Sequence, residues 1–214
     1  MLADILPLVD AFVRDEALRL ALDDKLAAIG LAVARYSQDR PRHLVEDVVS
    51  ADGVSLPLPG GWTADSDLVG AEYPIGESPP AAMVCTLYTA PSGAVFRLGD
   101  SIGAGATVRL TYTVLHTVSD VEDTVRLSHR EPLAAYAAAF LLENLSAAAI
   151  NDGDPTIGAD STDRRTKSQE YASRARACRK IYDEAVGRSP EGGPAASGVV
   201  VTWPSRGRLK NGIR

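Results

Sequence analysis

The chain has 214 residues, of which 45% are hydrophobic and 23% charged, the composition of a soluble protein with room for one large core or two small ones. No apolar run approaches the roughly 20 residues of a membrane span, and residues 1–10 carry Asp4 and Asp10 instead of basic residues, so neither a membrane segment nor a secretory signal is expected. The net charge of −6 divides into an acidic body, with 10 Lys/Arg against 23 Asp/Glu in residues 1–162, and a basic end, with 12 against 5 in residues 163–214.

Apolar residues recur at helical spacing through the first 36 residues and predict helices over 3–15 and 16–36. The run Tyr36–Arg42 ends this pattern. Pro41 lacks a backbone donor and disfavours helix in the residues before it, so we expect the second helix to stop near Tyr36. Alternation with period two follows, which makes the run a predicted junction between helix and strand.

Short β-type runs separated by Gly, Pro and Asp fill residues 43–119 and predict a small sandwich or barrel. Residues 107–114 alternate most cleanly, which indicates a strand with one buried and one wet face. The loop Gly99–Gly105 resembles a phosphate loop but lacks its lysine and precedes a strand, so it is predicted to be a hairpin loop. The six predicted strands cover 44–49, 54–58, 68–73, 83–89, 94–98 and 107–116.

Helical pattern returns after residue 119. Ser128 and Glu131 form a capping-box pattern ahead of an Ala-rich helix that runs to Ile150, and a second helix is predicted from Asp160 or Ser161 to near Gly187. The predicted fold class is therefore α+β. A helical bundle forms from both chain ends, 1–42 and 120–187; a small β-sandwich or barrel domain is inserted at 43–119; and 188–214 is a linker with an extended C-terminal tail.

No catalytic constellation is visible. The histidines His43, His116 and His129 lie at ends of predicted elements, where surface or turn positions are expected, and Cys85 and Cys178 lie in segments of different type, which predicts free thiols. The paired acidic residues fit no calcium-loop pattern, and no metal or cofactor site is expected. Trp62 is predicted to plug the edge of the β domain, with a sugar-binding anchor as the alternative. We therefore expect no enzyme.

The basic end offers a candidate interaction surface. Its predicted helix carries Arg164, Lys167, Arg174 and Arg179, which we expect to meet acidic protein surfaces, including neighbouring copies of this chain. Direct DNA binding is disfavoured because the rest of the chain is acidic and no recognition-helix motif is present. A solvated basic helix with a functionless tail stays an open alternative.

Several motifs, taken in order, resemble one family. They are Tyr-Ser-x-Asp-Arg-Pro-Arg at 36–42, Leu56-Pro57 with Trp62, Glu72-Tyr73-Pro74, Pro79-Pro80, Thr111-Tyr112-Thr113, and Ala-rich helices with Tyr171 to Tyr182. The chain resembles the head-to-tail connector (adaptor) proteins of tailed bacteriophages and related prophage particles. Its β insert is larger than in the minimal all-helical members of that family.

The resemblance implies a structural virion protein, located in the neck and made in the host bacterial cytoplasm. Such proteins form a ring, commonly of twelve copies, that docks beneath the portal protein and carries the next neck or tail component, a stopper or tail terminator, while DNA passes without specific binding. No membrane partner is implied. The C-terminal tail would enter the portal through Val199, Val200, Val201, Trp203, Arg206, Arg208, Lys210 and Arg214.

Two other classes stay open. One is an adhesive or carbohydrate-binding β module on a helical stalk, which would need aromatic pairs on one face; Trp62 and Tyr73 are the candidates. The other is an enzyme such as a lysis or neck-associated hydrolase, which the missing catalytic constellation disfavours.

Overall fold

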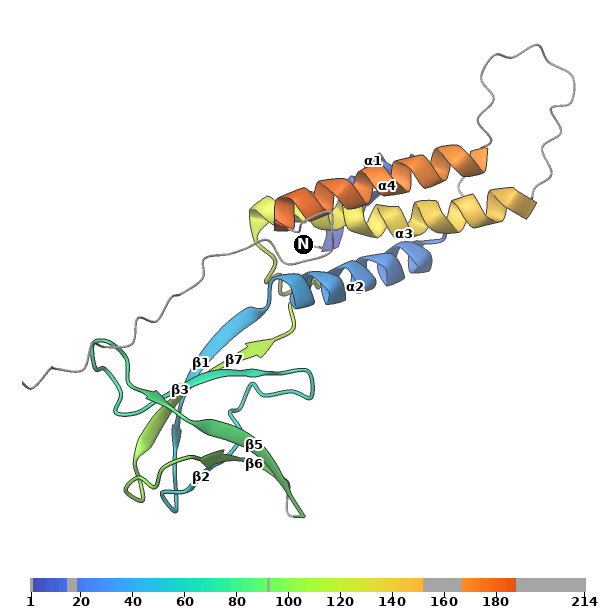
Figure 1. Ribbon diagram of the computed structural model, residues 1–214. Helices are drawn as coiled ribbons and strands as arrows, with labels where there is room; N and C mark the ends of the chain where they lie inside the picture. The colour runs from blue at the N-terminus through green and yellow to red at the C-terminus, as the bar shows by residue number, and fades with distance from the viewer. Residues whose placement is uncertain (1, 15–18, 92, 152–166, 188–214) are drawn as a thin grey trace, which may run out of the picture.

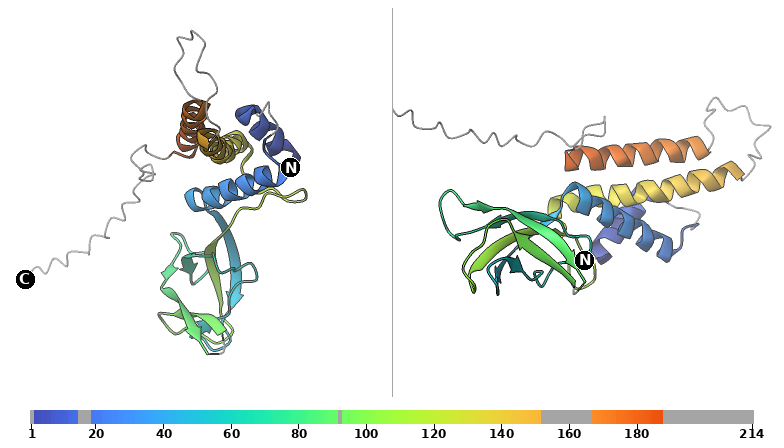
Figure 2. Two further views of the ribbon diagram at one scale, coloured as in Figure 1. Left: turned by 90° about the vertical axis from the view of Figure 1, so that its right-hand side faces the viewer. Right: turned by 60° about the horizontal axis from the view of Figure 1, so that its bottom comes forward.

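The computed structural model describes residues 2–14, 19–91, 93–151 and 167–187 (Figure 1). A helical unit and a β unit lie side by side, and the chain passes between them after the second helix and again before the third (Figure 2). The helices are α1 (Leu2–Val13), α2 (Leu22–Asp39), α3 (Arg130–Asn151) and α4 (Lys167–Val186), with a 3-10 turn over Leu127–His129. The strands are β1 (Arg42–Val49), β2 (Ser55–Leu56), β3 (Leu68–Glu72), β4 (Ala82–Met83), β5 (Cys85–Ala90), β6 (Gly93–Leu98) and β7 (Thr107–Val114).

Helix α3 is the centre of the helical unit and packs against α1, α2 and α4. Its buried alanines, among them Ala134, Ala135 and Ala138, have side chains small enough to let neighbouring helices approach closely. With the turn before it, Leu127–Ala149 is long and apolar enough to cross a membrane by length and composition. A helix that is apolar all round is also what the middle of a helical core requires. In this segment, 56% of the most apolar stretch of 18 residues is buried inside the protein.

Two antiparallel sheets make up the β unit: one of four strands in the order β1-β7-β3-β4, and one of three in the order β2-β6-β5. Both sheets contribute to one hydrophobic cluster that is separate from the helical core. The α+β prediction is thus confirmed, whereas neither sheet closes into a barrel among the described strands. The buried members of this cluster are Val48, Leu56, Ala71, Phe96, Leu98, Val108 and Leu110.

The predicted alternation of residues 107–114 is confirmed in β7. Val108, Leu110 and Tyr112 are buried, and β7 pairs with β1 along its whole length, from Arg42↔Val114 to Val49↔Thr107. On the outer face, the Arg109 guanidinium donates to both carboxylate oxygens of Asp47, at 2.8 and 3.0 Å. One face of the strand is therefore buried and the other partly exposed to solvent, as the sequence pattern predicts.

Two β-unit predictions are wrong for the same reason. Residues 83–89 do not form one strand, because Met83 pairs with Ala71 in the four-stranded sheet whereas Cys85 pairs with Leu98 in the other. Residues 99–105 are not a hairpin loop, because they connect β6 to β7, which belong to different sheets. Pairing with distant segments decides which sheet a strand joins, and local periodicity does not record it.

Helix ends also differ from expectation. Helix α2 continues to Asp39, three residues beyond the predicted end, because Pro41 forces only its immediate neighbour Arg40 out of helical geometry (φ −140°, ψ 70°). Ser128 lies inside the 3-10 turn and does not cap α3, since the chain already turns where the His129 amide donates to the Arg126 carbonyl at 2.8 Å. The predicted helix from 160 is described only from Lys167 onward.

Candidate functional site

The joint between the helical and β units holds a network of polar contacts. The run Tyr36–Arg42 supplies one side of it, since α2 ends there and β1 begins. The returning segment from β7 to α3 supplies the other, through His116, Thr124 and His129. The hydrogen bonds between the two sides join residues far apart in sequence: His116 and Arg40 are separated by 76 positions, and His129 and Tyr36 by 93. Only the fold brings them together.

His116 holds the return strand to the end of α2. Its backbone N–H donates to Ser37 Oγ at 2.9 Å, and Ser37 donates onward to the Val33 carbonyl at 2.8 Å. The imidazole Nε2 lies 2.8 Å from the Arg40 carbonyl oxygen, and Nδ1 lies 3.0 Å from that of Thr124. Nδ1 also lies 3.0 Å from the Thr124 hydroxyl oxygen, so a ring that carries its proton at Nε2 has a hydrogen-bond partner at both nitrogens.

A second histidine meets α2 from the start of α3. His129 Nδ1 lies 2.7 Å from the Tyr36 hydroxyl oxygen, and the Tyr36 ring also packs against the His116 ring with centroids 4.8 Å apart. Burial, reinforced by the nearby cations Arg126 and Arg40, lowers the pKa of His129, whereas burial raises the pKa of Tyr36. The structure thus favours a neutral imidazole accepting a hydrogen bond from a protonated phenol.

The end of α4 joins the same site. Arg40 Nη2 donates to the Val186 carbonyl at 2.7 Å, where the helix end leaves its carbonyls without partners. The Tyr182 hydroxyl donates to Asp39 Oδ2 at 2.9 Å, and Arg35 pairs with the same oxygen at 3.1 Å. Burial and the Asp39 carboxylate both raise the pKa of Tyr182. Helices α2 and α4 are therefore fixed to each other at the ends nearest the β unit.

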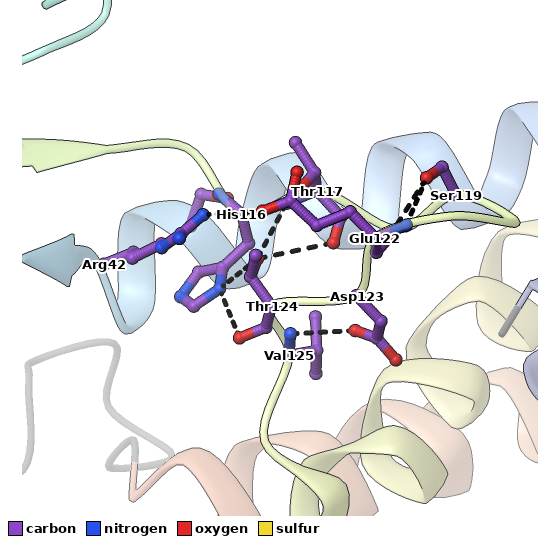
Figure 3. A network of polar contacts seen from close by, with 9 residues as sticks. Arg42, His116, Thr117, Ser119, Glu122, Asp123, Thr124 and Val125 are labelled. Atoms are coloured by element: carbon purple, nitrogen blue, oxygen red, sulfur yellow. Dashed lines mark hydrogen bonds and ion pairs between the residues drawn. The ribbon is translucent and has the colours of Figure 1, made fainter. Parts of the chain in front are cut away.

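The loop that returns from β7 is a compact turn (Figure 3). Ser119 Oγ accepts from the Glu122 amide at 2.9 Å, and Glu122 pairs with Arg42 at the start of β1 at 3.2 Å. Asp123 accepts from the Val125 amide at 2.8 Å and forms an ion pair with Arg130 at the start of α3 at 2.7 Å. The loop thereby ties the first strand to the first turn of α3.

A groove of about 520 Å³ opens at the joint, between the end of α2 and the return loop. Basic side chains dominate its lining, which includes Arg40, Arg42, Arg126, His43 and His116. Among the described residues, no group of three His, Cys, Asp or Glu side chains could hold a metal ion. The hydrogen bonds of the joint therefore hold the two units together, and the groove beside them is positively charged.

The predicted ring-interface residues that the structure describes are largely engaged within the chain. Arg174 donates to the Phe12 and Val13 carbonyls at 2.7 and 2.9 Å, where it binds the C-terminal end of α1. Arg179 pairs with Glu143 at 2.8 Å and lies over the Tyr136 and Phe140 rings. Lys167 is exposed and lines a groove of about 760 Å³ between α1 and α4.

Other sequence-predicted candidates fall outside the described residues. Arg164 and the whole predicted portal-binding set, Val199 to Arg214, are among them. Sequence reasoning missed the role of His116 and His129 at the joint. The available signal was their position: each lies at an end of an element, next to the segments that the chain uses to cross between units.

Trp62 packs inside the β unit. Its ring meets Phe96 edge to face with centroids 4.9 Å apart and lies 5.7 Å from the Tyr112 ring. Tyr73 packs against the same cluster. Both aromatic candidates for a sugar-binding face therefore contribute to the core, in agreement with the prediction that Trp62 plugs the β domain.

Comparison with known proteins shows a remote likeness to solved structures. No protein-family model matches the chain, and no curated protein matches it. Among solved structures, a chain described as the neck of an empty GTA particle, computed with C6 symmetry, matches 78% of this chain and 87% of its own length, with 14% identity and a TM-score of 0.25. A TM-score this low does not establish a shared fold.

Proposed function

We propose that this chain is a structural virion protein: a ring-forming head-to-tail adaptor that docks beneath a portal and joins the capsid to the neck or tail. One observation carries the proposal. The run Tyr36–Arg42, one of the motifs that together resemble the connector family, contributes to the joint that fixes the helical unit to the β unit. The motif therefore holds the two units of this fold together.

An adaptor must hold two partner-binding surfaces in a fixed relation. Here the chain crosses between units twice, and both crossings are held by hydrogen bonds from α2, the return loop and the end of α4. In the proposed assembly the helical unit forms the ring and the β unit meets the next component, a stopper or tail terminator. Such head-to-tail interfaces close into rings when the rotation between copies permits.

Charge supports passage of DNA without specific binding. Residues 1–162 carry a net charge of −13, from 10 Lys/Arg against 23 Asp/Glu. A ring of about twelve such bodies would surround its channel with negative potential, which repels phosphate. The acidic body thus suits a channel wall, and the basic end suits attachment to acidic protein surfaces.

The proposed portal anchor is the C-terminal tail, Val199 to Arg214. Its apolar Val199–Val201 run can pair with a strand edge, Trp203 can fill a pocket, and its four basic residues can pair with carboxylates. Truncation after Gly198 should leave the melting temperature unchanged and abolish co-purification with the portal. Trp203→Ala should weaken attachment by about 2 kcal/mol or more.

The decisive experiment is reconstitution with the portal protein of the same particle. Full-length chain should form rings on portals, visible by negative-stain electron microscopy, and the truncated chain should not. If the truncated chain bound portals with full affinity and yielded tailed particles, the tail would not be the anchor. A hydrolytic activity lost on replacing one histidine or carboxylate would refute the non-enzymatic role.

The alternative of a carbohydrate-binding β module loses its sequence-level support, since Trp62 and Tyr73 both pack into the β core. An adhesive role for the exposed strands would show as binding to cells or polysaccharide by the isolated protein, without any portal.

A further inference from the structure

Two helix faces of the helical unit are exposed in the described chain, and the one on α4 borders the groove between α1 and α4. On α2, the side opposite the buried residues carries Leu31, which is 55% exposed, flanked by exposed Ala27, Gly30 and Ala34, with Asp23 at the N-terminal end. We call this set the α2 face. On α4, the corresponding side carries Ile181, 38% exposed, with exposed Ser173, Arg176, Ala177 and Lys180. We call this set the α4 face.

We propose that the α2 face of one copy packs against the α4 face of the next copy. The inference rests on the ring proposed above and specifies which surfaces close it. Each face combines an exposed branched apolar side chain with small residues, so two helices can approach closely along it. The two faces lie on different helices that flank α3 (Figure 1), as a head-to-tail interface requires.

The charges of the two faces are complementary. The α2 face and its first turn carry Asp23 and Asp24, and Asp23 has no hydrogen bond or ion pair with any described residue. On the α4 face, Lys180 has an exposed ion pair with Glu184 at 3.7 Å. Arg176 is exposed and makes no hydrogen bond or ion pair with a described residue. The pairing therefore places a carboxylate opposite a guanidinium, each of which has no partner among the described residues.

Helix direction agrees with this pairing. Within one copy, the Tyr182–Asp39 and Arg40–Val186 bonds bring the C-terminal ends of α2 and α4 together. Both helices extend from these ends toward the same side of the molecule (Figure 1), so they run in the same direction. Neighbours in a twelve-membered ring differ by a rotation of about 30°, which keeps α2 and the next copy's α4 nearly parallel. With Ala27 opposite Ala177, Leu31 meets Ile181 one turn later. Arg176, whose side chain leans toward the helix N-terminus, then reaches Asp23.

Gly30 adds an independent argument. A glycine inside a helix costs stability relative to alanine, and no described atom lies within 4 Å of where a Cβ of residue 30 would stand. Packing within the chain therefore gives no reason for a glycine here. Close approach of a second helix from outside does.

The first test separates folding from assembly. Gly30→Ala should raise the thermal midpoint of the monomer, because it removes a helix-interior glycine from open space. Gly30→Leu and Leu31→Glu should leave a folded monomer by circular dichroism but reduce ring formation at least tenfold, measured by sedimentation velocity and by ring counts on portals. Leu87→Glu is the matched control, since Leu87 is 52% exposed on the β unit, and it should assemble like the unmodified chain.

The second test identifies the partner face. Asp23→Arg and Arg176→Asp should each weaken assembly several-fold, and the two together should restore it. Ala27→Cys combined with Ala177→Cys should give a ladder of disulfide-linked multimers on oxidation, whereas each single variant and the unmodified chain, which retain Cys85 and Cys178, should not.

The outcomes discriminate between the two proposals. Rings that form undiminished with Gly30→Leu or Leu31→Glu, or rings whose double-cysteine variant gives no ladder, would overturn this interface while leaving the adaptor function standing. A chain that forms no rings with or without portals would overturn the adaptor function and this interface with it.

Discussion

The neutral state of His129 makes the joint sensitive to acid, and His129→Gln tests this. In the folded protein the ring is partly buried, its Nδ1 lies 2.7 Å from the Tyr36 hydroxyl, and Arg126 and Arg40 stand nearby, so the pKa lies below the ordinary value of 6.5. Protonation would remove the acceptor at Nδ1 and add a third positive charge. Glutamine keeps an acceptor oxygen for the Tyr36 hydroxyl but does not titrate.

The direction in which the free energy of unfolding changes with pH follows from the difference in the His129 pKa between the folded and unfolded states. A depressed histidine pKa means that the unfolded state binds the proton more tightly, so the stabilisation from neutral His129 is present above about pH 6.5 and is lost as the pH falls toward the folded-state value. The loss cannot exceed about 1.4 kcal/mol per pH unit, the limit for one proton. His129→Gln should remove this contribution to the slope.

The assay is urea unfolding of both proteins between about pH 7.5 and pH 5, with the free energy of unfolding compared at each pH. His43, His116 and the carboxylates are common to both proteins, so the difference isolates His129 to first order. The advantage of the unmodified chain over His129→Gln should shrink as the pH falls. A difference that stays constant, or grows in acid, would refute the assignment of a neutral His129.

Three further changes test other parts of the fold. Tyr182→Phe should destabilise the protein by about 1 to 2 kcal/mol in urea unfolding, because it removes the buried hydroxyl that donates to a carboxylate oxygen of Asp39; an unchanged midpoint would contradict this. Gly53→Ala should cost more than about 2 kcal/mol, since residue 53 has φ +73° and a Cβ there would collide with the Ile102 carbonyl; a fold with unchanged melting would exclude that strain. Replacing 43–119 with a short Gly/Ser linker should preserve helical circular dichroism and a cooperative melt, because every buried residue of the helical core lies outside that range; a wholly unfolded remainder would refute the modular organisation.

Local patterns in the sequence suffice for most elements of this fold. Apolar spacing predicts the helical segments at both ends, and β-type runs divided by glycine and proline predict strands where the structure has them. The alternation in β7 even identifies which side chains are buried. These features depend on residues within a few positions of one another, which a linear pattern records directly.

Tertiary structure alone decides what those elements join. The break at Val84 that sends β4 and β5 into different sheets, and the passage of Gly99–Gly105 between sheets, depend on pairing with distant strands. His129 meets Tyr36 across 93 residues, and Arg174 turns inward to the end of α1 although its place in a basic helix suggests a free surface. Hydrogen bonds and ion pairs of this kind need exact positions in space, and charge or periodicity in the sequence does not fix those positions.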